Sequence, residues 1–117
     1  MRGIRGATQV AANTVPAIEE AVVELCRELE RRNEIRPQDI GWAIFTVTHD
    51  LDADFPARAA RAGGWTDVPM ICSREIPVPG SMPLVIRVLL HVDSDGARNH
   101  VYLRGAQALR PDLHVKP

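Results

Sequence analysis

Lysine is nearly missing from this chain of 117 residues: Lys116 is the single one, and arginine supplies the other long basic side chains. Aromatic residues make up 4% of the chain, too few for the stacking platform on which single-stranded nucleic acids bind. The formal net charge is −1, so no broad basic field is available for nucleic acid or for an anionic membrane surface. We therefore expect neither nucleic acid nor a membrane as a partner.

Long apolar runs and paired cysteines are lacking as well. No stretch has the length of a membrane-spanning helix or the pattern of a signal peptide. The two cysteines, Cys26 and Cys72, lie far apart in the sequence, which is typical of free thiols in a cytoplasmic protein. Hydrophobic residues make up 45% of the chain, enough for one domain over residues 1–117. Within it, we expect residues from about 111 to 117 to form a flexible tail.

The preference for arginine has two explanations. GC-rich codon usage would produce it without any role for the side chain, whereas a role in binding would use arginine's planar fork, which grips carboxylates as lysine cannot. The chain opens MRGIRGATQV, and on a strand Gly3, Arg5 and Ala7 would share one face. Arg5 would then stand between two very small residues, with room for a ligand beside it. For Arg2 we expect a structural or surface role.

Hydrophobic periodicity predicts five strands and two helices. Apolar residues at helical spacing indicate a long helix over residues 16–33, with Asn13 or Thr14 as its cap and Cys26 packed beside the apolar stripe. A short helix over residues 56–62 opens at a proline and is closed by a glycine pair. Strands are predicted over residues 2–10, 40–48, 68–76, 84–92 and 100–109.

The order of these elements predicts the α+β class, with a mixed β-sheet and one long and one short helix on one face. The segments 40–48 and 84–92 are apolar on both faces, as in strands that are covered from two sides. Two helices cover only one face, so the other face needs a different cover. Association of identical chains through that face is the economical solution, and we expect an oligomer.

Arg87 is the sharpest local anomaly, because it lies within the apolar strand LVIRVLLHV. A guanidinium in a dry strand is costly to bury unless it is paired. One explanation is a structural ion pair with Glu75, which lies near the end of the segment MICSREI. The other is an arginine directed at an anionic ligand, and the two remain open on this fact alone.

Other side chains extend the second explanation. Phe55, Arg58 and Arg61 are spaced three apart and share one face of the short helix. Tyr102 carries a hydroxyl that can donate to an anion, and Arg110 follows near the tail. Several arginines combined with one carboxylate suit a small dianion that also carries a hydroxyl group.

Metal, nucleotide and nucleophile sites are not indicated. Asp50, Asp52 and Asp54 are spaced like the start of a calcium loop, but its sixth position would be Phe55 instead of Gly and its twelfth Arg61 instead of Glu. The histidines show no ligand spacing with either cysteine, and no Gly-rich phosphate loop or Ser-His-Asp set can be argued. We therefore expect neither a metal nor an organic cofactor.

Six segments in order, RGIRGAT, DLDADFPARAAR, GWTDVPMICSREI, IRVLLHV, HVYLRGA and LRPDL, resemble the monofunctional chorismate mutases of the α/β, AroH class. The resemblance runs over nearly the whole chain, and the combination is specific although each segment alone is weak. It implies the rearrangement of chorismate to prephenate, on the route to phenylalanine and tyrosine. It also implies a homotrimeric pseudo α/β-barrel with active sites in clefts between neighbouring subunits.

The resemblance further implies the site residues. Arg5 matches the family's N-terminal carboxylate-binding arginine, and Tyr102 matches its carboxylate-binding tyrosine. Arg87 matches the arginine that contacts the ether oxygen of the substrate. Glu75 and Cys72 match a pair near the substrate hydroxyl, although residues three apart point to opposite faces of a regular strand. Either the strand bends between them, or one of them acts through its backbone.

A second group of matches would come from the adjacent subunit and the tail. The helix of the neighbouring chain would supply Phe55, Arg58 and Arg61, and the tail would supply Arg110. Two departures from the family pattern stand out: position 58 is often lysine in the family, and the turn at residues 94–99 and the tail are short. The residues that would cover the substrate are therefore less well defined than those on the strands beneath it.

The implied reaction is an intramolecular pericyclic rearrangement, in which a C–O bond breaks while a C–C bond forms. It needs no nucleophile, acid, base, metal or cofactor. Arg87 would stabilise negative charge on the ether oxygen. Arg5, Tyr102 and Arg61 would hold the carboxylates, with Arg58 and Arg110 as further candidates, and Glu75 would accept from the ring hydroxyl. A non-catalytic or differently catalytic metabolite-binding trimer of related fold is the alternative, because fold alone does not decide function.

Overall fold

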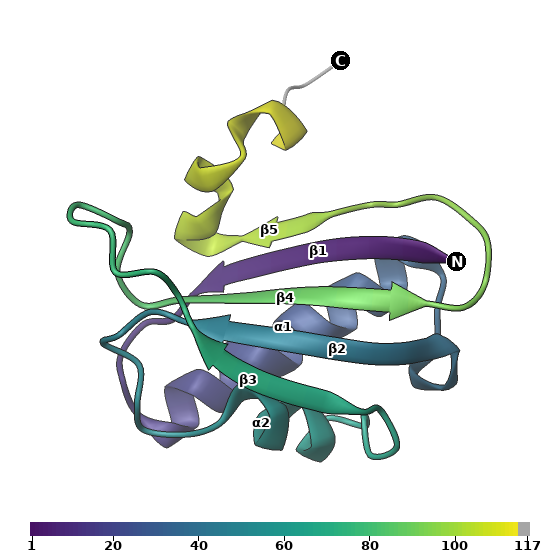
Figure 1. The fold of residues 1–117 in the computed structure, drawn as a ribbon, viewed down its shortest axis with the longest axis horizontal. Coiled ribbons are helices and arrows are strands. Elements are labelled where there is room, and N and C mark those ends of the chain that lie inside the picture. Colours follow the sequence, from purple (N-terminus) through teal and green to yellow (C-terminus); the bar gives the residue numbers. More distant parts are fainter. Residues whose placement is uncertain (115–117) are drawn as a thin grey trace.

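A five-stranded mixed sheet forms the centre of the molecule in the computed structural model, which describes residues 1–114 (Figure 1). The strands are β1 (Arg2–Gln9), β2 (Ile40–Val47), β3 (Met70–Arg74), β4 (Val85–Val92) and β5 (Val101–Leu103). Their order across the sheet is β3-β2-β4-β1-β5. β4 runs antiparallel to both of its neighbours, whereas the outer pairs β1/β5 and β2/β3 are parallel.

Two α-helices connect the strands. α1 (Val15–Asn33) begins where the Thr14 hydroxyl accepts the Ala17 N–H at 3.2 Å, and it ends at Glu34, whose φ of 51° lies in the left-handed region. α2 (Pro56–Ala62) opens with a proline and closes at a glycine. The two helices predicted from the sequence are confirmed, with nearly the same boundaries.

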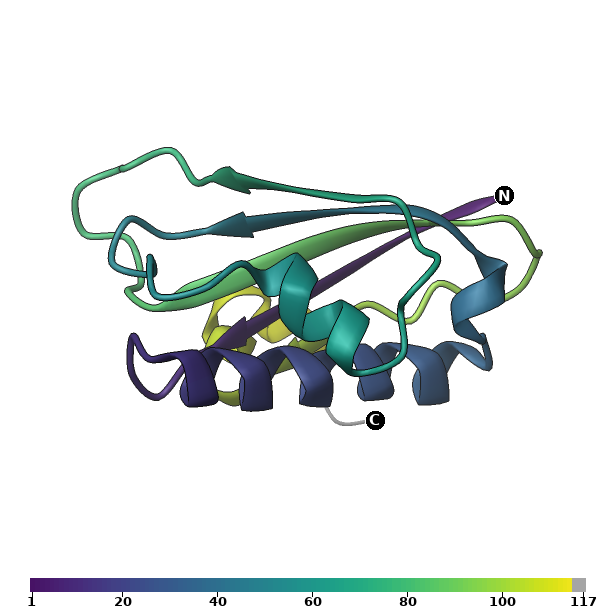
Figure 2. The same cartoon turned by 90° about the horizontal axis from the view of Figure 1, so that it is seen from below.

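Figure 2 shows α1 and α2 on one side of the sheet, and neither of them lies over the other face. The main core lies between the helices and the sheet. Gly6 permits the close approach of α1, because a Cβ there would lie 3.1–3.2 Å from the side chains of Val88, Leu25 and Leu29. Cys26 is buried in this core, and burial raises the pKa of its thiol, so its predicted role in packing is confirmed.

The described residues also form three short 3₁₀ helices: η1 (Pro37–Asp39), η2 (Arg104–Leu109) and η3 (Pro111–His114). η2 follows β5 and packs over the sheet face that α1 and α2 leave open, where it forms a small second cluster with β1 and β5. η3 occupies the first part of the predicted tail, and the remainder of that tail, residues 115–117, lies outside the described residues. No helix in the described part of the chain is long and apolar enough to cross a membrane.

The predicted last strand over residues 100–109 is wrong beyond Leu103. The chain leaves the sheet at Arg104, which has a φ of 54° in the left-handed region, and it then winds into η2. The Arg104 guanidinium is anchored on α1, 3.0 Å from the Glu24 carboxylate and 3.4 Å from that of Glu20. The residues after Leu103 thus contact a distant element, although the local pattern of the segment is compatible with a longer strand.

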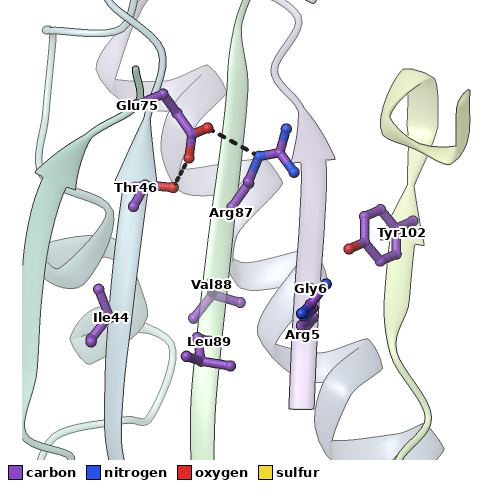
Figure 3. Close-up of a pocket in the computed structure, with 9 residues that line it drawn as sticks. All are labelled: Arg5, Gly6, Ile44, Thr46, Glu75, Arg87, Val88, Leu89 and Tyr102. Atoms are coloured by element: carbon purple, nitrogen blue, oxygen red, sulfur yellow. Dashed lines mark hydrogen bonds and ion pairs between the residues drawn. The ribbon is translucent and has the colours of Figure 1, made fainter. Parts of the chain in front are cut away.

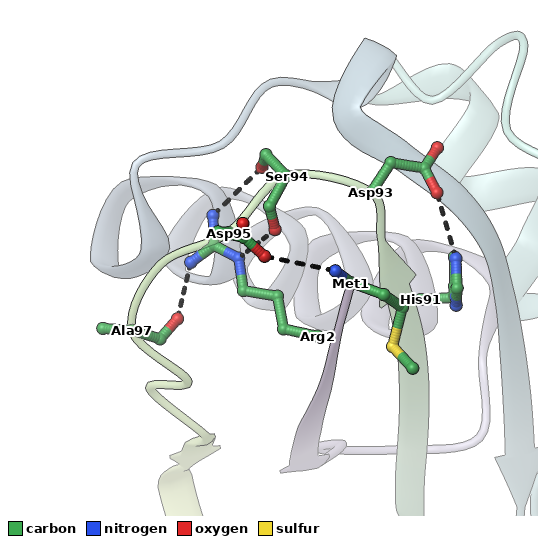
Figure 4. Close-up of polar contacts among 7 residues, drawn as sticks. All are labelled: Met1, Arg2, His91, Asp93, Ser94, Asp95 and Ala97. Atoms are coloured by element: carbon green, nitrogen blue, oxygen red, sulfur yellow. Dashed lines mark hydrogen bonds and ion pairs between the residues drawn. The ribbon is translucent and has the colours of Figure 1, made fainter.

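Arg2 has the structural role expected for it (Figure 4). Its guanidinium is buried and donates from Nε to the Ser94 carbonyl at 3.0 Å and from Nη1 to the Ala97 carbonyl at 2.5 Å. The N-terminal ammonium of Met1 adds an ion pair to Asp95 at 3.3 Å. These contacts hold the β4–β5 turn against the start of β1.

Candidate active site

A row of paired residues crosses the open face of the sheet. Thr46 on β2 pairs with Arg87 on β4, Arg87 pairs with Ala7 on β1, and Ala7 pairs with Tyr102 on β5. Residues paired in this way point to the same side of the sheet. Ala7 is fully buried and packs against Tyr102 and Ala106 in the small second cluster.

A second row lies two residues further along the strands. Ile44 on β2 pairs with Leu89 on β4, and Leu89 pairs with Arg5 on β1. A cavity of about 340 Å³ opens over the two rows, and the side chain of Glu75 closes one end of it (Figure 3). This size is within the range of pockets for small molecules.

Glu75 reaches the cavity because β3 ends just before it. Its backbone N–H donates to the Val47 carbonyl at 2.9 Å, and its side chain turns toward the open face. One carboxylate oxygen lies 3.2 Å from Nε of Arg87, and the other accepts a hydrogen bond from the Thr46 hydroxyl. The carboxylate is thus held between two neighbouring strands, with its charge beside the guanidinium.

Arg87 differs from the prediction in its exposure. Its side chain is 44% exposed, so the expectation of a guanidinium in a dry strand is wrong for a single copy, because none of the described residues covers it fully. The ion pair with Glu75 is therefore partly screened by solvent and is worth little for stability. The pair uses Nε and leaves both terminal nitrogens of Arg87 without an ion pair among the described residues.

Arg5 contributes an uncompensated charge to the cavity. Its guanidinium makes no ion pair within the part of the chain that the structure describes, and the residue is exposed. Tyr102 is nearly buried, with its hydroxyl directed toward the cavity (Figure 3). With Arg5 and Arg87 against the single carboxylate of Glu75, the lining carries a net positive charge, which suits an anionic ligand.

Arg110 lies near this group from the end of η2. It makes two hydrogen bonds to Asp112, at 3.1 and 2.9 Å. The Asp112 carboxylate raises the pKa of Arg110, and the Tyr102 hydroxyl adds to the effect. The structure therefore places Arg110 within electrostatic reach of Tyr102, with its present partner on η3.

Cys72 is not brought to the cavity. It pairs with Phe45 in the parallel β2/β3 ladder, so both side chains lie on the helix-covered face, where Cys72 packs against the main core. Glu75, three residues later, serves the open face, so the two residues lie on opposite sides of the sheet as a regular strand requires. A contact between the cavity and Cys72 would have to use its backbone.

The predicted residues of α2 also lie away from the cavity of their own chain. Arg58 is paired with Asp54 at 2.6 Å and Glu19 at 3.0 Å, and these carboxylates, Asp54 first, raise its pKa. Arg61 is exposed and makes no ion pair with any described residue, and Phe55 is 69% exposed. Because α2 packs on the covered side of the sheet, these side chains could meet a cavity only on another copy of the chain.

Thr46, Ile44 and Leu89 are among the lining residues that sequence reasoning missed. Thr46 carried a usable signal, since it is a hydroxyl residue within the apolar segment IGWAIFTVT. The other two resemble any core residue in sequence, and only the strand register places them on the open face beside Arg5 and Arg87.

The aspartates after β2 have structural partners within the chain. The Asp50 carboxylate accepts the Leu84 N–H at 3.1 Å, and the Asp52 carboxylate accepts from the Asn13 amide at 2.7 Å. Asp54 is occupied by Arg58, as described above. Across the described residues, no group of three or more His, Cys, Asp or Glu side chains is arranged to hold a metal ion.

Comparison with known proteins agrees with the geometry. A family model described as chorismate mutase type I matches residues 1–113. The chorismate mutase AroH of Thermus thermophilus is 48% identical over 117 residues, which covers 97% of this chain and 96% of that protein. The AroH of Bacillus subtilis is 38% identical over 119 residues, covering 98% and 94%. A solved chorismate mutase from Clostridium thermocellum has a TM-score of 0.89 at 46% identity, covering 92% of this chain and 99% of that one.

Proposed function

The chain belongs to the chorismate mutase type I family and is an isomerase of aromatic amino acid biosynthesis. We propose that it converts chorismate into prephenate, and that a second copy of the chain completes the cleft in which the reaction takes place. The observation that carries the proposal is the arrangement on the open face of the sheet. There Glu75 forms an ion pair with Arg87, and Arg5, which has no ion pair among the described residues, lies in the same cavity as the Tyr102 hydroxyl. A site of fixed positive charge suits a rearrangement within one bound molecule.

Arg87 is the residue that stabilises the transition state in this proposal. As the C–O bond of the substrate lengthens, negative charge grows on the ether oxygen, and a terminal N–H of Arg87 donates to it. The Glu75 and Thr46 contacts orient the guanidinium before the substrate arrives, so little reorganisation is needed during the reaction. In the assembled protein, cover from a second copy would exclude water and strengthen this interaction.

Arg5 and Tyr102 hold the substrate through a carboxylate. Arg5 has its fork free, and the Tyr102 hydroxyl is directed into the same cavity, so both can bind an anion without breaking an existing ion pair. Glu75 accepts a hydrogen bond from the ring hydroxyl and offsets part of the positive charge. Together they fold the flexible enolpyruvyl arm over the ring, which is an orientation effect.

A homotrimer with sites between subunits completes the proposal. Its first support is the open face, where Trp42, Ile71 and Leu89 are 39%, 64% and 40% exposed in the single chain. Its second support is the unpaired Arg61 on α2, remote from the cavity of its own chain. In this assembly, Phe55, Arg58 and Arg61 of one chain would lie around the substrate in the cleft, together with the tail residue Arg110. We also place the enzyme in the cytoplasm, where its two free cysteines would stay reduced.

A chorismate-disappearance assay on the purified chain tests the function. Turnover should survive exhaustive chelation with EDTA, because the substrate's own bonds carry the chemistry. Binding of chorismate without turnover would instead support a non-catalytic metabolite-binding protein. Loss of activity with EDTA, restored by a metal, would contradict the cofactor-free mechanism.

Subunit mixing tests the shared cleft. Arg61→Ala chains and Arg87→Ala chains should each be poorly active, and mixing them should restore activity in clefts that receive both arginines from different chains. The control is a mixture of two preparations of Arg87→Ala, which should gain nothing. Absence of recovery after verified subunit exchange, or a stable active monomer in sedimentation equilibrium, would remove the shared-site assignment.

A further inference from the structure

His100 lies where the β1/β5 ladder begins. The ladder pairs Gly6 with Val101, and one residue earlier the backbone N–H of Arg5 donates to Nδ1 of His100 at 2.9 Å. A side chain therefore provides the acceptor for the backbone N–H of Arg5 just before the paired segment starts. The residue whose backbone is held in this way is the one whose guanidinium stands uncompensated in the cavity.

We propose that His100 is a positioning residue for Arg5: its neutral imidazole holds the backbone of β1 at Arg5 and so directs the Arg5 guanidinium into the cavity. The proposal rests on the proposed function, since it takes Arg5 as a binding residue for a substrate carboxylate. His100 itself does not line the cavity and is not placed in contact with the substrate.

The hydrogen bond specifies the protonation state of the ring. An imidazole nitrogen that accepts a hydrogen bond carries no proton, so the neutral ring has its proton on Nε2. The groups that face His100 are positively charged and therefore favour the neutral ring. They are Arg5 on β1, Arg98 in the β4–β5 turn and Arg110 at the end of η2, and Arg32 of α1 lines the same surface hollow as His100. Burial first, and then the charges of Arg5, Arg110 and Arg98, lower the pKa of His100 below its ordinary 6.5.

Acid should therefore release Arg5. A protonated ring presents N–H at both nitrogens, so Nδ1 can no longer accept from the Arg5 backbone. The pKa of His100 in the folded protein lies below its ordinary value of 6.5. The hydrogen bond from the Arg5 N–H is therefore fully present above pH 6.5, and it is lost as the pH falls through the lowered pKa of His100. Substrate binding should weaken over the same range.

Two substitutions separate the acceptor from the rest of the ring. His100→Asn keeps an oxygen acceptor near the position of Nδ1 and cannot titrate, whereas His100→Phe keeps a ring but removes the acceptor. We expect His100→Phe to raise KM and to lower kcat/KM roughly threefold to tenfold, as expected for one neutral hydrogen bond, with kcat changed less. His100→Asn should stay within about twofold of the parent at neutral pH and should lose the acid-side rise in KM. His49→Asn, at an exposed histidine near Arg74, should keep the parent profile.

A measurement on the unsubstituted protein tests the contact without using activity. Long-range ¹H–¹⁵N NMR of the imidazole should show the Nε2–H form at neutral pH, and the Arg5 amide should shift as His100 titrates. An Nδ1–H form would overturn the proposal, as would a His100→Phe variant that folds with the parent KM. So would a His100→Asn variant that retains the acid-side rise in KM. If the chain does not turn over chorismate at all, the proposed function fails, while the NMR result still decides whether His100 positions Arg5.

Discussion

The two faces of the sheet have different roles: the covered face stabilises the fold, and the open face carries the proposed site. Neighbouring residues on one strand therefore have different roles. On β2, Phe45 is fully buried against the helices, and the next residue, Thr46, holds the Glu75 carboxylate on the open face. The covered face is closed by the chain itself, whereas the open face carries charge and exposed apolar side chains. Substitutions on the two faces should therefore have separable effects.

The same division explains the two arginines of β1. Arg2 points to the covered side, where carbonyl groups of the β4–β5 turn satisfy its donors. Arg5 points to the open side, where its donors have no ion-pair partner among the described residues. One residue type on one strand thus has a structural role and a proposed binding role, decided by strand alternation.

The largest effect on stability is expected from the covered face. Phe45→Ala should lower the free energy of unfolding by about 3–5 kcal/mol, because it leaves a cavity in the main core. Urea denaturation measures the loss, and activity per folded molecule should change little. Val15→Ala is the control, since Val15 is 43% exposed and its truncation should change the free energy of unfolding by less than about 0.5 kcal/mol. Equal losses at the two positions would contradict the division.

The open face should show the reverse pattern. Arg87→Ala should lower kcat on the order of a hundredfold or more, equivalent to about 3 kcal/mol of transition-state stabilisation, with little loss of stability. Arg87→Lys should also be poor, because an ammonium cannot reproduce the guanidinium fork. Steady-state kinetics with folding checked by circular dichroism measures both.

Arg31→Ala is the control for Arg87, because Arg31 forms an exposed ion pair with Glu28 on α1 and should affect neither kinetics nor folding strongly. If Arg87→Ala stays folded and raises only KM, Arg87 is a binding residue. The electrostatic role would then move to another cation of the cavity, with Arg5 the next candidate.

The smallest effect concerns Thr8, a polar residue on the covered face. Its hydroxyl is fully buried and has no hydrogen-bond partner among the described residues. Thr8→Val replaces it with a methyl group of similar shape, so it should raise the free energy of unfolding by about 1 kcal/mol or leave it unchanged. Thermal or urea unfolding measures the change, and a loss greater than about 1 kcal/mol would show that the hydroxyl has a favourable role.

Local signals in the sequence were enough where one element decides its own geometry. The start of α1 was marked by two candidate caps, of which Thr14 is the one used, and by the following proline, and the apolar stripe marked the face that packs. The strand that ends at Leu103 could not be predicted in this way, because the anchor of Arg104 is on α1, about eighty residues earlier. The exposure of Arg87 also depends on the absence of cover from the same chain.

By itself, the sequence determined the α+β class, the two helices, the packing of Cys26 and the set of charged residues from which a site could be built. Only the tertiary structure decided which of those residues meet. The strand register aligns Thr46, Arg87, Ala7 and Tyr102 in one row, directs Cys72 into the core and brings His100 to the backbone of Arg5. The physical reason is that strand pairing joins residues distant in sequence, and a shift of one residue would reverse the face that each side chain occupies.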